Sequence, residues 1–189
     1  GGWWGNGRKA GWISPLLLAS YDPATGAYQS VCKVMSGFSD TFYKAMNIFF
    51  FGDYGKSLGS KFRTGDTEIS PARARAVVTG TEEPQTTAAE GWACHEGSKI
   101  LKEKPEEYDV SDHYRPTFWF LPSVVWEIAA ADVTVSPTHR CGWHIVENEY
   151  GGRGISLRFP RFLRARPDKV IKTSTDPQFI VNAFFSQSK

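Results

Sequence analysis

The sequence has few cysteines and no long apolar run, and each shortage excludes a class of protein. Its three cysteines, Cys32, Cys94 and Cys141, are odd in number and widely spaced, which does not predict a disulfide framework and fits a reducing intracellular compartment. No apolar run approaches the roughly 18 residues that span a bilayer, so no membrane partner is expected. The start, Gly1 to Trp4, lacks the features of a signal peptide.

Composition instead predicts one folded domain. Of the 189 residues, 41% are hydrophobic and 14% aromatic, which is enough for a core and excludes a disordered or collagen-like chain. The 22 Lys and Arg nearly balance the 20 Asp and Glu, so net charge alone indicates no partner. The charges are nevertheless segregated: residues 151–172 carry seven cations and one acid, whereas 82–112 carry nine acids and three lysines.

Several apolar runs bounded by turn residues predict β-strands. Residues 12–36 are expected to form a hairpin, and Pro15 places its first strand partly at a sheet edge. Further strands are expected over 118–135. A last strand should run over 154–166 and be broken at Pro160.

Helix signals are fewer. Ser39 is a plausible cap for a short helix ending at Gly52, and Asp176 precedes an apolar stripe typical of a terminal helix. Residues 52–115 show little periodicity and are predicted to be a long insertion, with a strand or a helical turn over 72–78. We therefore expect an all-β class: a small barrel of about five strands, with a helix between strands and another at the C-terminus.

The basic strand near the C-terminus has the least expected pattern. One alternating row is apolar apart from Arg161, and the other presents arginines at strand spacing, suited to tracking phosphates or to forming a solvated outer face. The apolar row is Ile155, Leu157, Phe159, Leu163 and Ala165, and the other is Ser156, Arg158, Pro160, Phe162, Arg164 and Arg166. Phe159, an aromatic beside arginines at a strand break, is a candidate wedge or stacking residue, with a core role as the alternative.

Other chemical motifs are weak. The pairs Cys94-His95 and Cys141-x-x-His144 lack the spacing of zinc ligands, so no metal site is expected. No G-x-S-x-G elbow of a serine hydrolase occurs. The loop from Gly5 to Lys9 is a glycine turn with two cations and a weak capacity to bind phosphate.

Several strings, in this order, resemble the C-terminal domain of ATP-dependent DNA ligases of the eukaryotic replicative type. The most specific is GISLRFPRF at 154–162, followed by R-P-D-K at 166–169; GWISPLLLASYD at 11–22 and VCKVMSGFSD at 31–40 support it. The resemblance covers about 1–50 and 117–189. It implies an OB-fold, a five-stranded barrel, as one domain over 1–189 with an insertion at about 52–115.

The resemblance also implies a DNA-binding surface. In this family the phenylalanine of the R-F-P-R string presses into the minor groove near a nick, which points to Phe159. Arg158 and Arg161 would contact the backbone beside it. Arg8 and Lys9 would lie at the DNA or at an interdomain hinge.

The R-x-D-K string resembles the last nucleotidyltransferase motif of the family. There it orients the β- and γ-phosphates of ATP during enzyme adenylation, which assigns Arg166, Asp168 and Lys169. Their role would be to stabilise charge as pyrophosphate leaves.

One departure from the family concerns the nucleophile. Such ligases need a lysine in a K-x-D-G string, and no lysine here is followed by x-D-G. We therefore expect the terminal piece of a longer ligase, inactive alone, whose upstream adenylation and DNA-binding domains complete the enzyme. The full enzyme would use ATP and Mg²⁺ to seal nicked double-stranded DNA in the nucleus, in replication, repair and recombination.

Two other functions remain open at this stage. The first is a free-standing OB module that binds single strands without chemistry, for which Arg166, Asp168 and Lys169 would have no use. The second is the OB domain of an mRNA-capping or RNA-ligating relative. The R-F-P-R-F string favours duplex DNA over that alternative.

Overall fold

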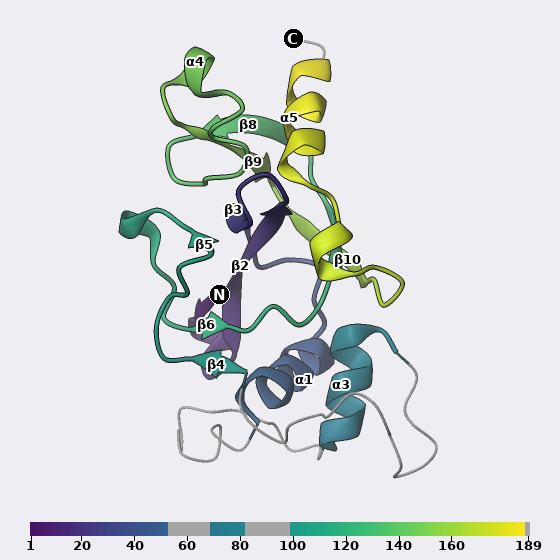
Figure 1. Ribbon diagram of the computed structural model, residues 1–189. Coiled ribbons are helices and arrows are strands. Elements are labelled where there is room, and N and C mark those ends of the chain that lie inside the picture. Colours follow the sequence, from purple (N-terminus) through teal and green to yellow (C-terminus); the bar gives the residue numbers. More distant parts are fainter. Residues whose placement is uncertain (53–68, 82–98, 188–189) are drawn as a thin grey trace.

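A computed structural model describes residues 1–52, 69–81 and 99–187, and in this part of the chain strands are combined with helices (Figure 1). The strands are β1 (Gly2–Trp4), β2 (Ile13–Asp22), β3 (Ala27–Val34), β4 (Ile100–Leu101), β5 (Tyr108–Asp109), β6 (Trp119–Phe120), β7 (Trp126–Ala129), β8 (Asp132–Ser136), β9 (Gly154–Arg158) and β10 (Arg161–Ala165). They form one four-stranded sheet, β1-β2-β3-β5, and three pairs, β10-β7, β4-β6 and β8-β9. No closed barrel is found among these described strands.

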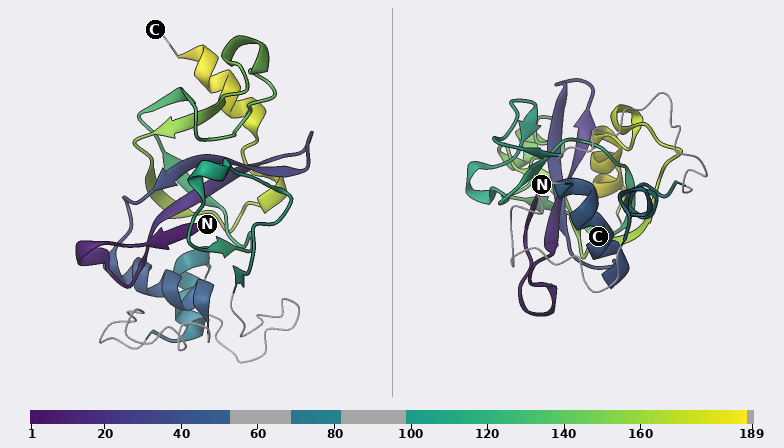
Figure 2. Two further views of the ribbon diagram at one scale, coloured as in Figure 1. Left: turned by 90° about the vertical axis from the view of Figure 1, so that its left-hand side faces the viewer. Right: turned by 90° about the horizontal axis from the view of Figure 1, so that it is seen from below.

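The helices are α1 (Asp40–Phe51), α3 (Pro71–Thr79), α4 (Glu147–Tyr150) and α5 (Pro177–Ser186), with 3-10 turns η1 (Gly7–Lys9), η3 (Asp112–Tyr114) and η4 (Ile171–Thr173). The all-β expectation is therefore corrected to a mixed class, while the expected C-terminal helix is present. Figures 1 and 2 place α1 and α3 at one end of the molecule and α4 and α5 at the other, with β2 and β3 between them.

The predicted hairpin is confirmed as β2 and β3, joined by the turn after Asp22. Its expected partial edge position is confirmed: β1 pairs with β2 only between Ile13 and Leu16, and β3 pairs with it only from Leu16 to Asp22, so Pro15 has no partner residue on β3. Pro15 is tolerated there because the pairing of β1 with β2 is irregular between Gly2 and Trp4, so no regular ladder bond is lost.

Both predicted helix starts are confirmed. The Ser39 hydroxyl accepts a hydrogen bond from the Phe42 amide at 3.1 Å, and the Asp176 carboxylate accepts one from the Phe179 amide at 2.8 Å. Such a cap needs only a side chain and an amide three residues later, so the sequence pattern suffices to predict it.

Helix α3 lies within the segment 52–115. It begins at Ser70, whose hydroxyl accepts a hydrogen bond from the Arg73 amide at 3.1 Å, and ends at Gly80 in a left-handed conformation. Ala74 and Val78 are fully buried in the same cluster as α1. The described part of this segment thus contributes to the core, and the remaining residues, 53–68 and 82–98 with Cys94, lie outside the described chain.

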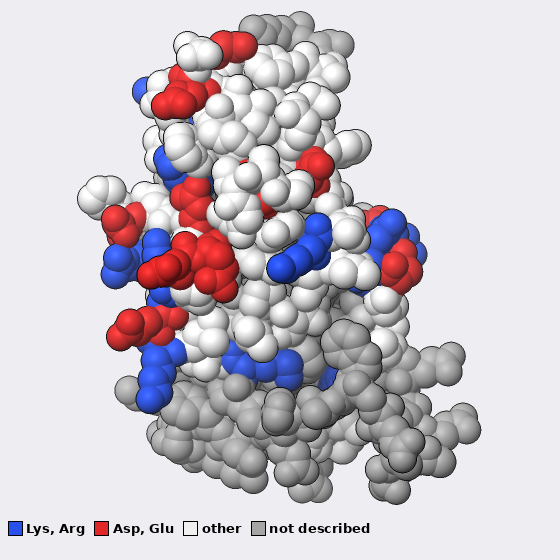
Figure 3. Space-filling model, in the orientation of Figure 1, with Lys and Arg blue, Asp and Glu red and all other residues white. Residues whose placement is uncertain are grey.

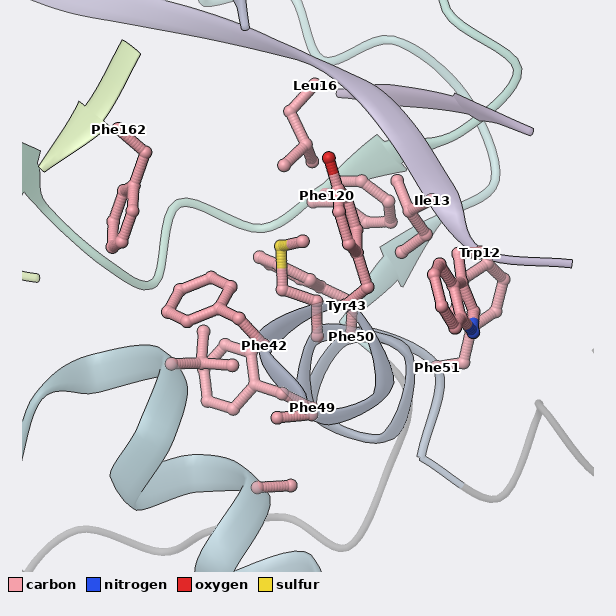
Figure 4. Close-up of a cluster of buried hydrophobic side chains, with 14 of the residues drawn as sticks. Trp12, Ile13, Leu16, Phe42, Tyr43, Phe49, Phe50, Phe51, Phe120 and Phe162 are labelled. Carbon is pink, nitrogen blue, oxygen red and sulfur yellow. The ribbon is translucent and has the colours of Figure 1, made fainter. Parts of the chain in front are cut away.

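The largest buried cluster is rich in aromatic side chains and forms where α1 meets the strands (Figure 4). Its phenylalanines come from α1 (Phe42 and Phe49 to Phe51), from β6 (Phe120) and from β10 (Phe162). A second cluster joins β3 and β9 to α5 and includes Cys32 and Cys141. Both thiols are free, and burial raises the pKa of Cys32 to about 12, so they pack as small apolar groups.

Candidate functional site

The last predicted strand is divided into β9, which pairs with β8, and β10, which pairs with β7. The break lies at Phe159 and Pro160, as the proline predicts. Phe159 is the only non-glycine residue in the described chain with a positive φ, 51°, and it is 75% exposed. The Arg158 guanidinium lies 5.2 Å from the centre of the Phe159 ring. A fixed backbone turn therefore presents an aromatic ring and a cation to solvent, an arrangement suited to stacking on or wedging between bases.

This turn also changes which side chains face inward along β10. Phe162 is buried, with its ring centre 4.7 Å from that of Phe38, whereas Leu163 is 50% exposed. The predicted rows are therefore wrong for Phe159, Phe162 and Leu163, although Ile155 is buried as expected. The reason is that Phe159 and Pro160 do not continue the strand, so the alternation restarts at Arg161.

Two cations flank the Phe159 turn. Arg158 ends β9 and Arg161 begins β10, and both are exposed. Neither forms an ion pair with another residue that the structure describes. Their charges are therefore available to an anionic ligand.

Arg8 and Lys9, in η1, have different surroundings although they are neighbours. The Arg8 side chain is 76% exposed and lies 3.6 Å from Asp40. The Lys9 ammonium donates hydrogen bonds to the Met35 carbonyl at 2.6 Å and to the Tyr43 hydroxyl at 2.7 Å. Arg8 thus remains accessible to a ligand, whereas the ammonium of the half-buried Lys9 is engaged by two acceptors of the protein.

The residues after β3 contact the Phe159 turn directly. The Ser36 hydroxyl donates to the Pro160 carbonyl at 2.9 Å, and the Phe162 amide donates to the Ser36 carbonyl at 3.0 Å. Gly37 has a φ of +93°, and a Cβ there would lie 2.1 Å from the Phe162 carbonyl oxygen. The sequence pattern predicts no role for Ser36 and Gly37, because no local signal indicates partners so distant along the chain.

At the other end of β10, carboxylates hold Arg166. Its Nε and Nη2 donate to the two oxygens of Asp168 at 2.8 and 2.7 Å, and its Nη1 donates to Glu127 Oε2 at 3.0 Å. Arg164 Nε donates to the same Glu127 oxygen at 2.9 Å. Glu127, on β7, is a residue that sequence reasoning missed, because no local signal connects it to Arg166, 39 residues later in the chain.

These bonds favour the ionised carboxylates. The hydrogen bond from Arg166 lowers the pKa of Asp168 to about 2, and the bond from Arg164 lowers the pKa of Glu127. Both groups therefore stay charged at neutral pH and keep Arg166 in one orientation. Lys169 is exposed, and its amide donates to the Arg166 carbonyl at 3.1 Å, so the R-x-D-K string closes into a turn.

The Phe159 turn and the Arg166 cluster lie at opposite ends of β10. Arg161 and Arg166 are five residues apart, or about 17 Å along an extended strand. Arg166 and Lys169 help to line an open hollow of about 800 Å³, whose other walls are mainly apolar residues of β2 and β3 and of the chain from β6 to β7. Figure 3 shows cationic and anionic side chains adjoining where Figure 1 places the loop after β10.

Other chemical groups are sparse in the described chain. No cluster of three or more His, Cys, Asp or Glu there could hold a metal ion, and the pair Cys94-His95 lies outside it. No helix of this part is long and apolar enough to cross a membrane.

Comparison with known proteins gives one consistent result. A family model described as the ATP dependent DNA ligase C terminal region matches residues 76–169. The chain is 33% identical to DNA ligase 3 of Schizosaccharomyces pombe over 187 residues, 99% of the chain and 18% of that protein. It is 35% identical to DNA ligase 6 of Arabidopsis thaliana over 189 residues, all of the chain and 10% of that protein. DNA ligase 1 of Drosophila melanogaster is 33% identical over 189 residues, again all of the chain and 19% of that protein.

The extent of these matches corrects one expectation. The resemblance was expected to leave residues 52–115 unmatched, but the family model begins at residue 76, inside that segment. The position of α3 in the core agrees with this wider match. The chain spans less than a fifth of the length of each of these three relatives.

Proposed function

Because the chain belongs to the ATP-dependent DNA ligases, as their C-terminal region, we propose that it closes a longer ligase around nicked duplex DNA and assists the step that consumes ATP. The intact enzyme would become adenylated, transfer AMP to the 5′-phosphate of the nick, and join the ends by attack of the 3′-hydroxyl. The lysine that carries AMP would come from elsewhere in the polypeptide, since no K-x-D-G string occurs here. A nuclear location, in replication, repair and recombination, is part of the same proposal.

For the fold we propose one OB-fold domain over 1–189. The Arg140 and Cys141 amides donate to the Ser30 carbonyl of β3 at 2.9 and 3.0 Å, and Cys141 forms a bridge with Ile155 of β9. The Phe162 amide joins β10 to Ser36 at the end of β3. Separate strand pairs that meet in this way are compatible with a partly open barrel, the form that OB-folds take.

The exposed ring of Phe159 is the observation that carries the DNA-binding part of the proposal. A phenylalanine that is 75% exposed in a left-handed turn is unfavourable for a water-facing role alone, because both exposure and backbone conformation cost free energy. In the proposed complex the ring enters the minor groove beside the nick, and Arg158, Arg161 and Arg8 contact phosphates.

Arg166 and Lys169 would act on ATP. An arginine has five N–H donors, and the bonds to Asp168 and Glu127 engage three of them, so two remain for phosphate oxygens. The Lys169 ammonium would add a second positive charge. Asp168 would then be a positioning residue, because both of its oxygens are engaged by Arg166. Mg²⁺ bound with ATP would neutralise part of the phosphate charge, and the two cations would stabilise the pyrophosphate as it forms.

Paired substitutions in the intact ligase test both parts. Phe159→Ala should slow the sealing of a nick that already carries AMP by at least about tenfold, because a base-contacting ring is lost, with far less effect on self-adenylation. Arg166→Ala should do the reverse and slow self-adenylation by about 100-fold. Both steps are measured with radiolabelled ATP and with a pre-adenylated nicked duplex.

Phe185→Ala is the matched control, because Phe185 is an exposed phenylalanine, 51%, on α5 and does not line the hollow beside Arg166 and Lys169. It should leave both steps unchanged. Equal losses in both steps for Phe159→Ala would indicate a core role and contradict the wedge assignment. A protein that takes up no AMP but binds single strands would instead favour the free-standing OB module.

A further inference from the structure

The half-buried Lys9 is bonded to two groups of the protein, beside the loop that supports the Phe159 turn. We propose that Lys9 is a positioning residue, which fixes this turn through Met35 and Ser36 and does not contact a DNA phosphate. The inference rests on the proposed role of Phe159 at the nick. It replaces the expectation that Lys9 itself lies against DNA.

The first observation is how the Lys9 ammonium is used. Two of its three N–H donors are bonded at short distance, to the Met35 carbonyl (2.6 Å) and the Tyr43 hydroxyl (2.7 Å). The ammonium also lies 4.8 Å from the centre of the Tyr43 ring, within the range of a cation–π interaction. A phosphate contact by Lys9 would require breaking these two hydrogen bonds, whereas Arg8 has only an exposed ion pair with Asp40 at 3.6 Å.

The second observation is that the Met35 carbonyl accepts two hydrogen bonds. The Tyr43 hydroxyl, on a side chain that is 2% exposed, donates to the same Met35 carbonyl at 2.9 Å. Lys9 and Tyr43 thus bond each other and share one acceptor. Because Tyr43 lies in the core cluster on α1, the three groups fix the end of β3 relative to that helix.

The third observation concerns Ser36 and Gly37, which come directly after Met35 in the chain. Ser36 bonds the turn with both its hydroxyl and its carbonyl, and Gly37 has no room for a Cβ against the Phe162 backbone. The path from Lys9 to Pro160 therefore consists of hydrogen bonds and two adjacent residues. A shift of Met35 would be transmitted to the Phe159 turn.

The backbone of Phe159 explains why support is needed. A non-glycine residue with φ near +51° is in a sparsely populated conformation that persists only where its surroundings hold it. On the β9 side the turn is held by the Ala131 amide, which donates to the Arg158 carbonyl at 3.0 Å. On the β10 side it is held by Ser36, and through it by Lys9.

The test uses salt dependence, which distinguishes a phosphate contact from a positioning role. A lost phosphate contact reduces the slope of log binding constant against log salt by about 0.9. In the intact ligase, Lys9→Met should therefore leave the slope for a nicked duplex unchanged, whereas Arg8→Met should reduce it by about 0.9. Lys9→Met should nevertheless slow sealing of a pre-adenylated nick roughly tenfold relative to self-adenylation, because the ring is misplaced.

Further variants test the route. Lys9→Arg keeps donors for the Met35 carbonyl and should restore much of the sealing rate. Tyr43→Phe removes the shared hydroxyl and should slow the same step, and combining it with Lys9→Met should add little. Lys102→Met, at an exposed lysine between β4 and β5, is the control for loss of one charge.

The outcomes separate the two proposals. A reduced salt slope for Lys9→Met, or normal sealing of the adenylated nick by it, overturns the positioning role even if Phe159→Ala is impaired. If Phe159→Ala itself seals normally, the proposed function of Phe159 fails and this inference fails with it. Melting temperatures of all variants identify any loss that arises from unfolding.

Discussion

His139 is a buried histidine with one unsatisfied nitrogen. It is 8% exposed, its Nδ1 has no hydrogen-bond partner among the described residues, and its ring packs edge-on against Tyr114. Burial, reinforced by the Lys33 charge, lowers the pKa of His139 to about 4. Because this value lies below the roughly 6.5 of an unfolded histidine, the stability that the neutral ring contributes is complete above pH 6.5 and is lost as pH falls toward 4.

His139→Phe keeps a ring against Tyr114 and removes the titrating group. Between pH 7 and pH 4, the free energy of unfolding of the unmodified chain should fall by about 3 kcal/mol more than that of the variant. Urea unfolding followed by tryptophan fluorescence at several pH values measures this difference. His113→Phe, at an exposed histidine in η3, is the control and should follow the unmodified chain. Parallel curves for His139→Phe would contradict the assignment.

At the scale of elements, the segment after β3 packs against β10 at Gly37. This residue has a φ of +93° and would place a Cβ 2.1 Å from the Phe162 carbonyl oxygen. Gly26, in the turn between β2 and β3, also has a positive φ, +72°, but nothing lies within 4 Å of its Cβ position. Both glycines thus need a left-handed backbone conformation, but only at Gly37 would a side chain also clash with a neighbouring strand.

Substituting each glycine by alanine separates these effects. Gly26→Ala should lower the free energy of unfolding by roughly 1 kcal/mol, the cost of a left-handed alanine. Gly37→Ala should lower it by roughly 3 kcal/mol, because β10 must also move. Denaturant unfolding of the two variants under identical conditions gives the difference. Equal losses of unfolding free energy would mean that β10 moves away from residue 37 at no energetic cost.

Helix α3 illustrates what local signals establish about an element. In the structure it is capped by Ser70, has Pro71 at its first position and ends at Gly80 in a left-handed conformation, whereas the sequence predicted only a strand or a helical turn over 72–78. The short alanine-rich stretch between them did not distinguish a helix from a strand. Packing of Ala74 and Val78 against α1 determined the helix, through contacts that no periodicity within the segment specifies.

At the scale of the molecule, the proposed DNA surface carries few free cations. The candidates are Arg158, Arg161 and Arg8, whose ion pair with Asp40 is exposed and 3.6 Å long, since Lys9 is engaged by Met35 and Tyr43 and Arg166 by carboxylates. Each phosphate contact contributes about −0.9 to the slope of log binding constant against log salt, so three contacts give about −2.7.

The 189-residue chain alone should therefore bind a nicked duplex weakly, with a salt slope no steeper than about −3. Fluorescence anisotropy of a labelled duplex over a series of salt concentrations measures this slope. A triple variant, Arg8→Gln, Arg158→Gln and Arg161→Gln, should abolish most of the binding. A slope steeper than about −5 would show that cations outside this set also contact the DNA.

The sequence by itself determined the features that depend on nearby residues: the caps at Ser39 and Asp176, the hairpin turn after Asp22 and the strand break at Pro160. It also sufficed to recognise the family, because its strings occur in order along the chain. Each of these needs only bonds or patterns within a short stretch.

Only the tertiary structure decided which residues meet across long separations. It turned Phe162 inward and Leu163 outward, placed α3 in the core, paired Arg166 with Glu127, and engaged Lys9 on Met35 and Tyr43. The physical reason is that burial and charge pairing depend on the distance between atoms in space. Those distances are set by how the strands and helices pack, which the order of residues does not state directly.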